Sequence, residues 1–311
     1  MTLRLETISA RQRVRTLMQV EGDLAFRRRC ETILEWLDPA PGERVLDCGC
    51  GYGFTLRVLA ELTESPLVGL DADPERVAQT RRNLASFPQV TVVHGDARAL
   101  PFADAVFDHA VCSEVLEHVP DAAAVVGELE RVVRPGGRLV ITVPSAAFPV
   151  TWDPPNWILK RLGGAQLKGE RPWSGIWYGH RRLYDWEQLE TLLAGAGLEL
   201  EERRPLTFRS PPFAHLLLYG IGKPLLQHGW LPGALRRQAG RVPGDAASPG
   251  ILARSVMWVL EAIDAPNDDP ARVARASEFV ALAVVARRTM QAERVAAGGQ
   301  EDLSITAPHR A

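Results

Sequence analysis

One glycine-rich stretch constrains the fold of this chain more than any other feature. The segment Val45–Gly53 reads as a buried strand that runs into a turn with glycine at alternate positions, Gly49, Gly51 and Gly53. Glycine lets a backbone turn tightly and lets a ligand approach it closely. A helix is expected from about Phe54, and its N-terminus would offer unpaired N–H groups to that ligand. This order of strand, turn and helix predicts a nucleotide-binding α/β unit.

The spacing of the glycines separates two kinds of nucleotide site. Dinucleotide-binding proteins use G-x-G-x-x-G, whereas this turn has G-x-G-x-G with Asp47 two positions before it. The spacing therefore disfavours a nicotinamide dehydrogenase. Cys48 and Cys50 flank Gly49, but no second cysteine or histidine pair accompanies them. We interpret them as small core residues and expect no metal site.

Apolar strands and amphipathic helices alternate along the first half of the chain. The expected strands are 45–46, 67–70, 90–94, 107–112 and 138–143. They are continuous apolar runs, which is typical of a parallel sheet covered by helices on both faces. Such sheets bind ligands beyond the carboxyl ends of their strands. The polar residues at those ends are Asp47, Asp71, Asp96, Ser113 and Glu114.

Several of these features together resemble the class I S-adenosylmethionine-dependent methyltransferases, in their small-molecule, type 11-like branch. The motifs are the glycine turn, Asp71, Asp96-Ala97, Leu116-Glu117-His118 and Gly179–Tyr184. The resemblance covers about residues 30–145 and, more weakly, 178–206 and 278–288. It implies an α/β fold with a Rossmann-like parallel sheet closed by an antiparallel hairpin of 198–206 and 279–286. That sheet has seven strands, with helical insertions.

The resemblance also implies S-adenosyl-L-methionine as the cofactor and assigns residues to it. Asp47, Gly49, Gly51 and Gly53 would cradle its methionine portion. Asp71 would accept hydrogen bonds from both ribose hydroxyls, since a carboxylate accepts at both oxygens. Asp96 and Ala97 would touch the adenine, and Ser113 is placed in the same site. Asp47 could instead tie the turn together by accepting from backbone N–H groups.

Methyl transfer from a sulfonium needs alignment of acceptor and methyl group and exclusion of water. A general base is required only for a poor nucleophile such as a hydroxyl. His118 and His180 are the candidate catalytic residues, because both belong to polar segments expected at the open end of the sheet and imidazole titrates near neutrality. His118 could instead orient the loop after the fourth strand.

Two insertions are expected to select the acceptor. Residues 145–182 form a Trp-rich lid, and residues 207–277 form a helical cap. Within 207–255 there are six Lys or Arg residues against one acidic residue, beside apolar runs, so peripheral contact with a membrane is an alternative to the cap. We expect a small hydrophobic, aromatic or lipid-like acceptor. The expected substrate-binding residues are Trp152, Trp177, Tyr178, Arg181 and Tyr184.

The rest of the chain completes the predicted organisation. Residues 1–22 form a basic N-terminal leader, 23–206 plus 278–290 the methyltransferase domain, and 291–311 a disordered tail. The net charge of −2 gives no general attraction to nucleic acid. Four cysteines without disulfide spacing favour a reducing, cytoplasmic compartment.

Two alternative functions stay open. One is a methyltransferase that acts on a protein or nucleic acid. Asp153-Pro154-Pro155-Asn156 resembles the D-P-P-Y motif of amino-group methyltransferases, but it follows the fifth strand instead of the fourth, and Asn156 stands where an aromatic residue is needed. We interpret it as a loop. The other is a non-catalytic cofactor-binding scaffold, although the intact glycine turn argues against loss of the cofactor.

Overall fold

A seven-stranded sheet forms the centre of the protein, which a computed structural model describes over residues 10–18, 21–169, 171–217 and 251–289. The strand order is β3-β2-β1-β4-β5-β7-β6. β7 pairs antiparallel with β5 and with β6, whereas the pairs among β1 to β5 are parallel. The predicted closing hairpin is therefore confirmed. The strands are β1 (Val45–Cys48), β2 (Leu67–Asp71), β3 (Val90–His94), β4 (Phe107–Ser113), β5 (Val133–Pro144), β6 (Leu198–Leu206) and β7 (Ala281–Arg288).

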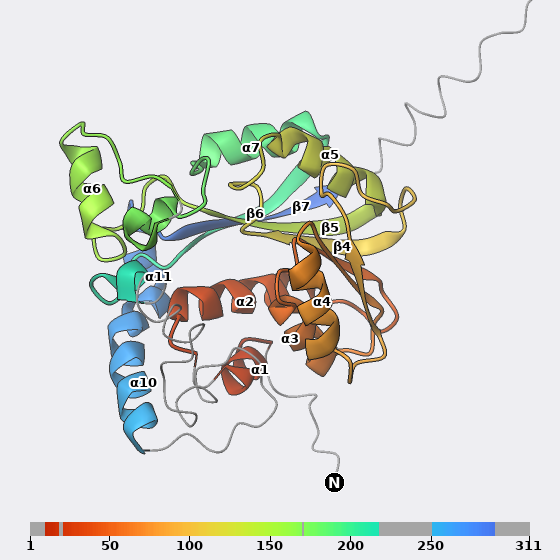
Figure 1. The fold of residues 1–311 in the computed structure, drawn as a ribbon, viewed down its shortest axis with the longest axis horizontal. Coiled ribbons are helices and arrows are strands. Elements are labelled where there is room, and N and C mark those ends of the chain that lie inside the picture. The colour runs from red at the N-terminus through yellow and green to blue at the C-terminus, as the bar shows by residue number, and fades with distance from the viewer. Residues whose placement is uncertain (1–9, 19–20, 170, 218–250, 290–311) are drawn as a thin grey trace, which may run out of the picture.

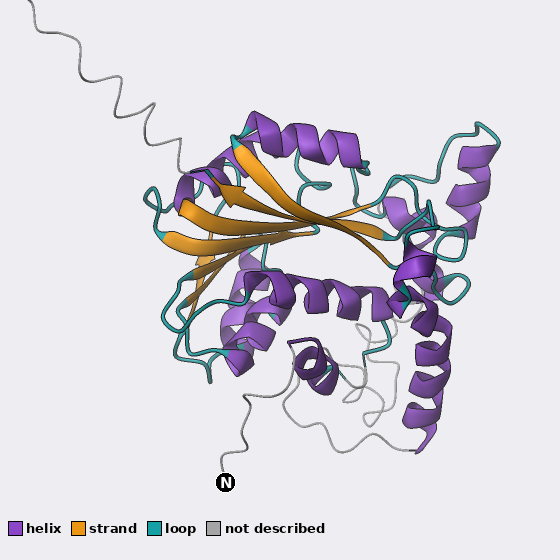
Figure 2. Ribbon diagram, turned by 180° about the vertical axis from the view of Figure 1, so that it is seen from behind, coloured by secondary structure: helices purple, strands orange, loops and turns teal. Residues whose placement is uncertain are grey.

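Helices cover both faces of the sheet (Figures 1 and 2). One face carries α5 (Ala122–Val132) and α7 (Trp186–Gly195), and the other carries α1 (Ala10–Leu17), α2 (Leu24–Leu37), α3 (Phe54–Leu62) and α4 (Pro74–Asn83). Each face buries its own apolar core. Cys48 is buried in one core and Cys50 in the other, which confirms that both are core residues.

Acidic N-caps fix where several of these helices begin. Asp73 accepts from the Glu75 and Arg76 N–H groups at the start of α4, and Asp185 forms a capping box with Gln188 at the start of α7. Both caps satisfy N–H groups that would otherwise have no partner. They confirm the helix starts expected from the sequence.

The fifth strand begins earlier than expected. β5 starts at Val133, directly after α5, and its pairing with β4 shifts register between Phe107 and His109. A Cβ on Gly137 would lie 2.3 Å from the Asp108 carbonyl oxygen. The glycine thus lets the two backbones come close at an irregularity that strand periodicity does not reveal.

Two segments differ from the sequence interpretation. The sequence favours a solvated face for the Arg residues of the leader, but Val14 is buried in the same core as α2 and Arg15 pairs with Glu31 at 2.8 Å, so this part packs on the domain. The segment Asp153–Asn156 starts a helix, α6 (Pro154–Arg161), and is not a loop. Asp153 caps it, and proline in a first helical turn loses no hydrogen bond.

The helices α6, α10 (Ile251–Asp264) and α11 (Pro270–Val273) lie beyond the carboxyl ends of the parallel strands (Figure 1). Two short 3₁₀ helices, η2 (Pro172–Trp177) and η4 (Ala265–Asp268), lie in the same region. Residues 218–250 of the predicted cap and the predicted tail lie outside the described residues. None of the described helices combines the length and apolar character needed to cross a bilayer.

Candidate functional site

The glycine turn has the backbone conformation that its sequence requires. Gly49, Gly51 and Gly53 have φ angles of 80°, 54° and 80°, a region that glycine adopts without strain. The Gly49 N–H donates to the Leu70 carbonyl at 2.7 Å. The turn therefore sits at the carboxyl edge of the sheet, where β1, β2 and α3 meet.

Asp71 fastens this turn. Its Oδ2 accepts from the Gly51 N–H at 2.8 Å and its Oδ1 accepts from the Asp73 N–H at 2.9 Å. The Thr80 hydroxyl on α4 donates to the Gly51 carbonyl at 2.7 Å. The tying role that the sequence left open for Asp47 thus belongs to Asp71. A carboxylate offers about four acceptor positions, so each Asp71 oxygen can still accept a hydrogen bond from a ligand.

Asp47 has a carboxylate oxygen without a partner. The side chain is buried, and its Oδ2 accepts no hydrogen bond from the described residues. Asp47 lines a cavity of about 430 Å³ together with Gly49, Gly51 and Gly53. A buried carboxylate without a donor costs free energy. Because Asp47 lines the cavity, its carboxylate marks the part of the cavity that suits a cationic or N–H-bearing ligand.

The other walls of the cavity come from α2 and from the end of β4. Phe26 and Arg29 belong to α2, and Ser113 and Glu114 end or follow β4. Arg29 pairs with Glu114 at 2.9 Å. Neither Phe26 nor Arg29 was predicted from the sequence as a site residue, because the side of α2 that faces the turn depends on how the helix packs on the sheet.

The remaining predicted cofactor residues divide into two groups. Ser113 lines the cavity, and its hydroxyl shares a hydrogen bond of 2.8 Å with Thr142. Asp96 and Ala97 do not line it. Asp96 is exposed and paired with Arg98 at 2.6 Å, and Ala97 is buried in the core. Contact of this pair with an adenine stays a prediction.

The two predicted catalytic histidines lie side by side. The rings of His118 and His180 have centroids 4.8 Å apart, although 61 residues separate their segments. Glu117, fully buried, lies against both. Burial, and next the neighbouring His118, lower the pKa of His180 to about 3, so its imidazole is neutral at pH 7.

The predicted substrate residues do not line this cavity. Trp152 and Trp177 are buried in a separate apolar cluster with Phe148. Tyr184 is buried and donates its hydroxyl to the Leu116 carbonyl. Arg181 donates to the His118 carbonyl at 3.0 Å.

Tyr178 and Arg181 are exposed, Tyr178 at 42%. Trp157, from the same Trp-rich segment, lines a second cavity of about 290 Å³ with Lys160 and Glu278. Trp152 and Trp177 therefore pack against protein, and contact of the predicted substrate residues with a substrate stays a prediction.

Comparisons with known proteins identify related chains. A family model described as "Methyltransferase domain" matches residues 46–141. The demethylmenaquinone methyltransferase of Clavibacter sepedonicus is 32% identical over 214 residues, which cover 65% of this chain and 83% of that protein. An uncharacterized 37.1 kDa protein in transposon TN4556 of Streptomyces fradiae is 42% identical over 131 residues, or 42% of this chain and 36% of that protein.

Solved structures show the same fold. The [4+2]-cyclase SpnF matches with a TM-score of 0.53 and 20% identity, over 91% of this chain and 97% of that one. The chain spans 36%, 65% and 46% of the length of the first three curated relatives it matches.

Proposed function

Because the chain belongs to the class I S-adenosylmethionine-dependent methyltransferases, we propose that it transfers a methyl group from S-adenosylmethionine to a small apolar acceptor. The observation that carries this proposal is the unpaired Asp47 oxygen beside the glycine turn. S-adenosylmethionine has a cationic amino group and two ribose hydroxyls. Asp47 suits the first, and the remaining acceptor positions of Asp71 suit the second. Bound there, the cofactor supplies a sulfonium methyl group with its leaving group built in.

The chain contributes mainly position and exclusion of water. The glycine turn lets the ligand approach the backbone, and the apolar side chain of Phe26 on α2 lines the same cavity. Arg29 and Glu114 neutralise each other at the rim through their ion pair. Such a site aligns a nucleophile with a methyl group without needing a charged residue at the point of transfer.

His118 and His180 stay the candidate bases. A base with a pKa of about 3, as for His180, takes up a proton poorly at neutral pH, because general-base catalysis is most effective when the pKa lies near the working pH. This favours a transfer that depends on positioning over one that depends on His180 as a base.

The acceptor is proposed to be hydrophobic, aromatic or lipid-like. The relative from Clavibacter sepedonicus is named for demethylmenaquinone, and a less extensive match from rice is named for a 24-methylenesterol. Exposed large apolar side chains also occur in the described parts of 207–277. They are Phe213, Leu216, Leu217, Val256, Trp258 and Val259. Of these, Phe213, Leu216 and Leu217 lie within 207–255 and would support peripheral membrane contact through that segment.

Calorimetric titration tests the cofactor, and a radiolabel assay tests the transfer. We expect one S-adenosylmethionine per chain and no binding of NAD. The label should then pass to a lipophilic phenol or quinol in a panel that also contains a protein and an RNA. Binding of NAD instead would contradict the assignment of the cavity to S-adenosylmethionine. Cofactor binding without transfer to any acceptor would support the non-catalytic scaffold alternative.

Cofactor affinity should depend on pH through Asp47. Burial, and next the charge of Asp71, raise the pKa of Asp47 to about 7. If only the ionised carboxylate holds the cationic amino group, affinity falls as the pH drops through 7. The expected loss between pH 7.5 and pH 6 is roughly tenfold. Calorimetry with Asp47→Asn, which removes the titration, should give weaker but pH-independent binding. An equally steep profile in that variant would assign the effect to another group.

A further inference from the structure

Three ligand-type side chains converge beside the cavity. Glu117, His118 and His180 each offer one donor atom, and these atoms lie within 4.8 Å of one another. Glu117 has no exposed surface, and neither of its carboxylate oxygens has a hydrogen-bond partner among the described residues. Burial raises the pKa of Glu117 well above its ordinary value. A carboxylate in this position is costly unless a cation compensates it.

The hydrogen bond of His118 aims a lone pair at this carboxylate. Nδ1 of His118 lies 2.9 Å from the Gly179 carbonyl oxygen, which only accepts, so Nδ1 carries the proton. In the neutral ring Nε2 then holds the lone pair, and it lies 3.8 Å from Oε1 of Glu117. A carbonyl that orients a ring through its other nitrogen is the usual outer-sphere arrangement of a metal-binding histidine.

His180 approaches the same oxygen from the other side. Its Nε2 is 3.9 Å from Oε1 of Glu117. Both histidine–carboxylate distances exceed hydrogen-bonding range, so neither imidazole satisfies Glu117. In a tetrahedral zinc site with ligand bonds of about 2.1 Å, two donor atoms lie roughly 3.4 Å apart. The two histidine–carboxylate separations, 3.8 and 3.9 Å, are somewhat longer, so side-chain rotations would draw the three donor atoms together around the ion.

We propose that Glu117, His118 and His180 bind a divalent first-row transition-metal ion, with zinc as the expected occupant. Two imidazole nitrogens and one carboxylate oxygen suit such ions better than magnesium or calcium, which prefer oxygen ligands. Three protein ligands leave coordination positions open. The carboxylate supplies negative charge, and the ion supplies the partner that the buried carboxylate lacks.

The site adjoins the proposed methyl-transfer cavity. Glu114, which lines the cavity, is three residues before Glu117, and its negative charge helps to raise the pKa of Glu117. If the proposed function holds, an open coordination position could take an oxygen of the acceptor and lower its pKa. Metal binding itself does not depend on that function.

Metal titration of the full chain tests the site directly. The protein is purified without a histidine tag, stripped with a chelator and titrated calorimetrically with Zn²⁺, and with Co²⁺ as a visible spectroscopic probe. We expect one ion per chain. Glu117→Gln and His118→Ala should each weaken binding at least about 100-fold. His94→Ala is the matched control, since the His94 ring lies 3.1 Å from the Ala72 carbonyl oxygen and is not part of the Glu117, His118 and His180 cluster, and it should bind as the wild type does.

The outcomes separate the two proposals. Absence of stoichiometric binding in the wild type, or wild-type affinity in Glu117→Gln, would overturn the metal site. Glu117→Gln keeps the side-chain shape, so it decides the matter if His118→Ala fails to fold. S-adenosylmethionine titration of the stripped protein reports the cofactor site independently, because Asp47 and Asp71 are not among the proposed metal ligands.

Discussion

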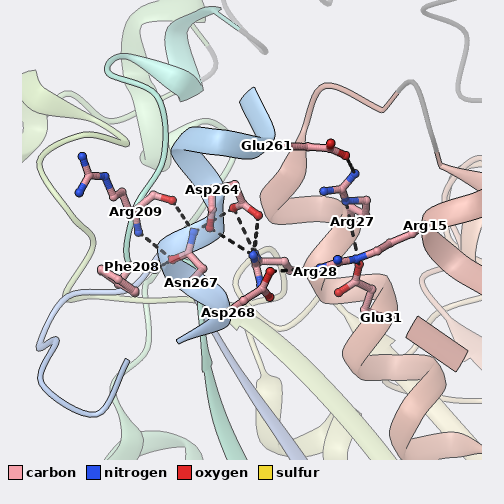
Figure 3. Close-up of polar contacts among 10 residues, drawn as sticks. All are labelled: Arg15, Arg27, Arg28, Glu31, Phe208, Arg209, Glu261, Asp264, Asn267 and Asp268. Atoms are coloured by element: carbon pink, nitrogen blue, oxygen red, sulfur yellow. Dashed lines mark hydrogen bonds and ion pairs between the residues drawn. The ribbon is translucent and has the colours of Figure 1, made fainter. Parts of the chain in front are cut away.

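Replacing Arg28 with alanine is expected to lower the free energy of unfolding by about 3–5 kcal/mol. Arg28 on α2 holds Asp264 at the end of α10 through Nε and Nη2, at 2.9 and 2.5 Å, and Asp268 through Nη1 at 2.8 Å (Figure 3). Asp264 is 3% exposed. Removing the guanidinium would leave a buried carboxylate without its main counter-charge, which is why the expected loss is large.

Together with the neighbouring contacts, this network links α2 to the end of the predicted cap. Asn267 donates to Asp264 and accepts from the Phe208 N–H, and Arg27 pairs with Glu261 (Figure 3). Because α2 also carries Phe26 and Arg29 to the cavity, Arg28→Ala should also weaken cofactor binding. The sequence predicted α2 and the cap as separate segments, and no pattern in it indicated that the two would be in contact.

Chemical denaturation measures the stability effect. The control is Arg272→Ala in α11, whose exposed pair with Asp269 should contribute less than about 1 kcal/mol. In a double-mutant cycle, Asp264→Ala should cost much less in the Arg28→Ala background than alone. A loss in Arg28→Ala no larger than in Arg272→Ala would mean that the network does not stabilise the fold.

Replacing Gly49 with alanine is expected to cost about 2–5 kcal/mol of stability and to abolish measurable cofactor binding. At its φ of 80° an L-residue is strained by about 1–2 kcal/mol. Its Cβ would also lie 2.3 Å from Cγ2 of Val115, and overpacking of this kind adds about 1–3 kcal/mol. Val115 is a stiff, β-branched residue in the loop after β4, so the backbone of the turn would have to move.

Gly42→Ala provides the matched control for this prediction. Gly42 has a similar φ of 87°, but a Cβ there would meet no atom within 4 Å. It should therefore show only the conformational cost, with normal cofactor affinity. Denaturation and calorimetry on both variants separate the two contributions. Equal stability losses in the two variants would show that contact with Val115 does not restrict the turn.

The sequence by itself determined which segments of the first half form strands, the glycine turn and the helix caps. These features depend on interactions among near neighbours in the chain. The continuous apolar runs require a sheet buried on both faces, a turn with three positive φ angles requires glycine, and Asp73 and Asp185 cap helices that begin at the next residue.

Only the tertiary structure decided which polar groups meet. The sequence offered Asp47 as a tie for the turn, but Asp71 holds the Gly51 N–H because the parallel pairing of β1 and β2 brings their carboxyl ends together. Glu117 reaches His180 only because the segment before α7 folds back over the end of β4. Contacts of this kind follow from how the helices and loops pack on the sheet, and neither periodicity nor residue spacing encodes that packing.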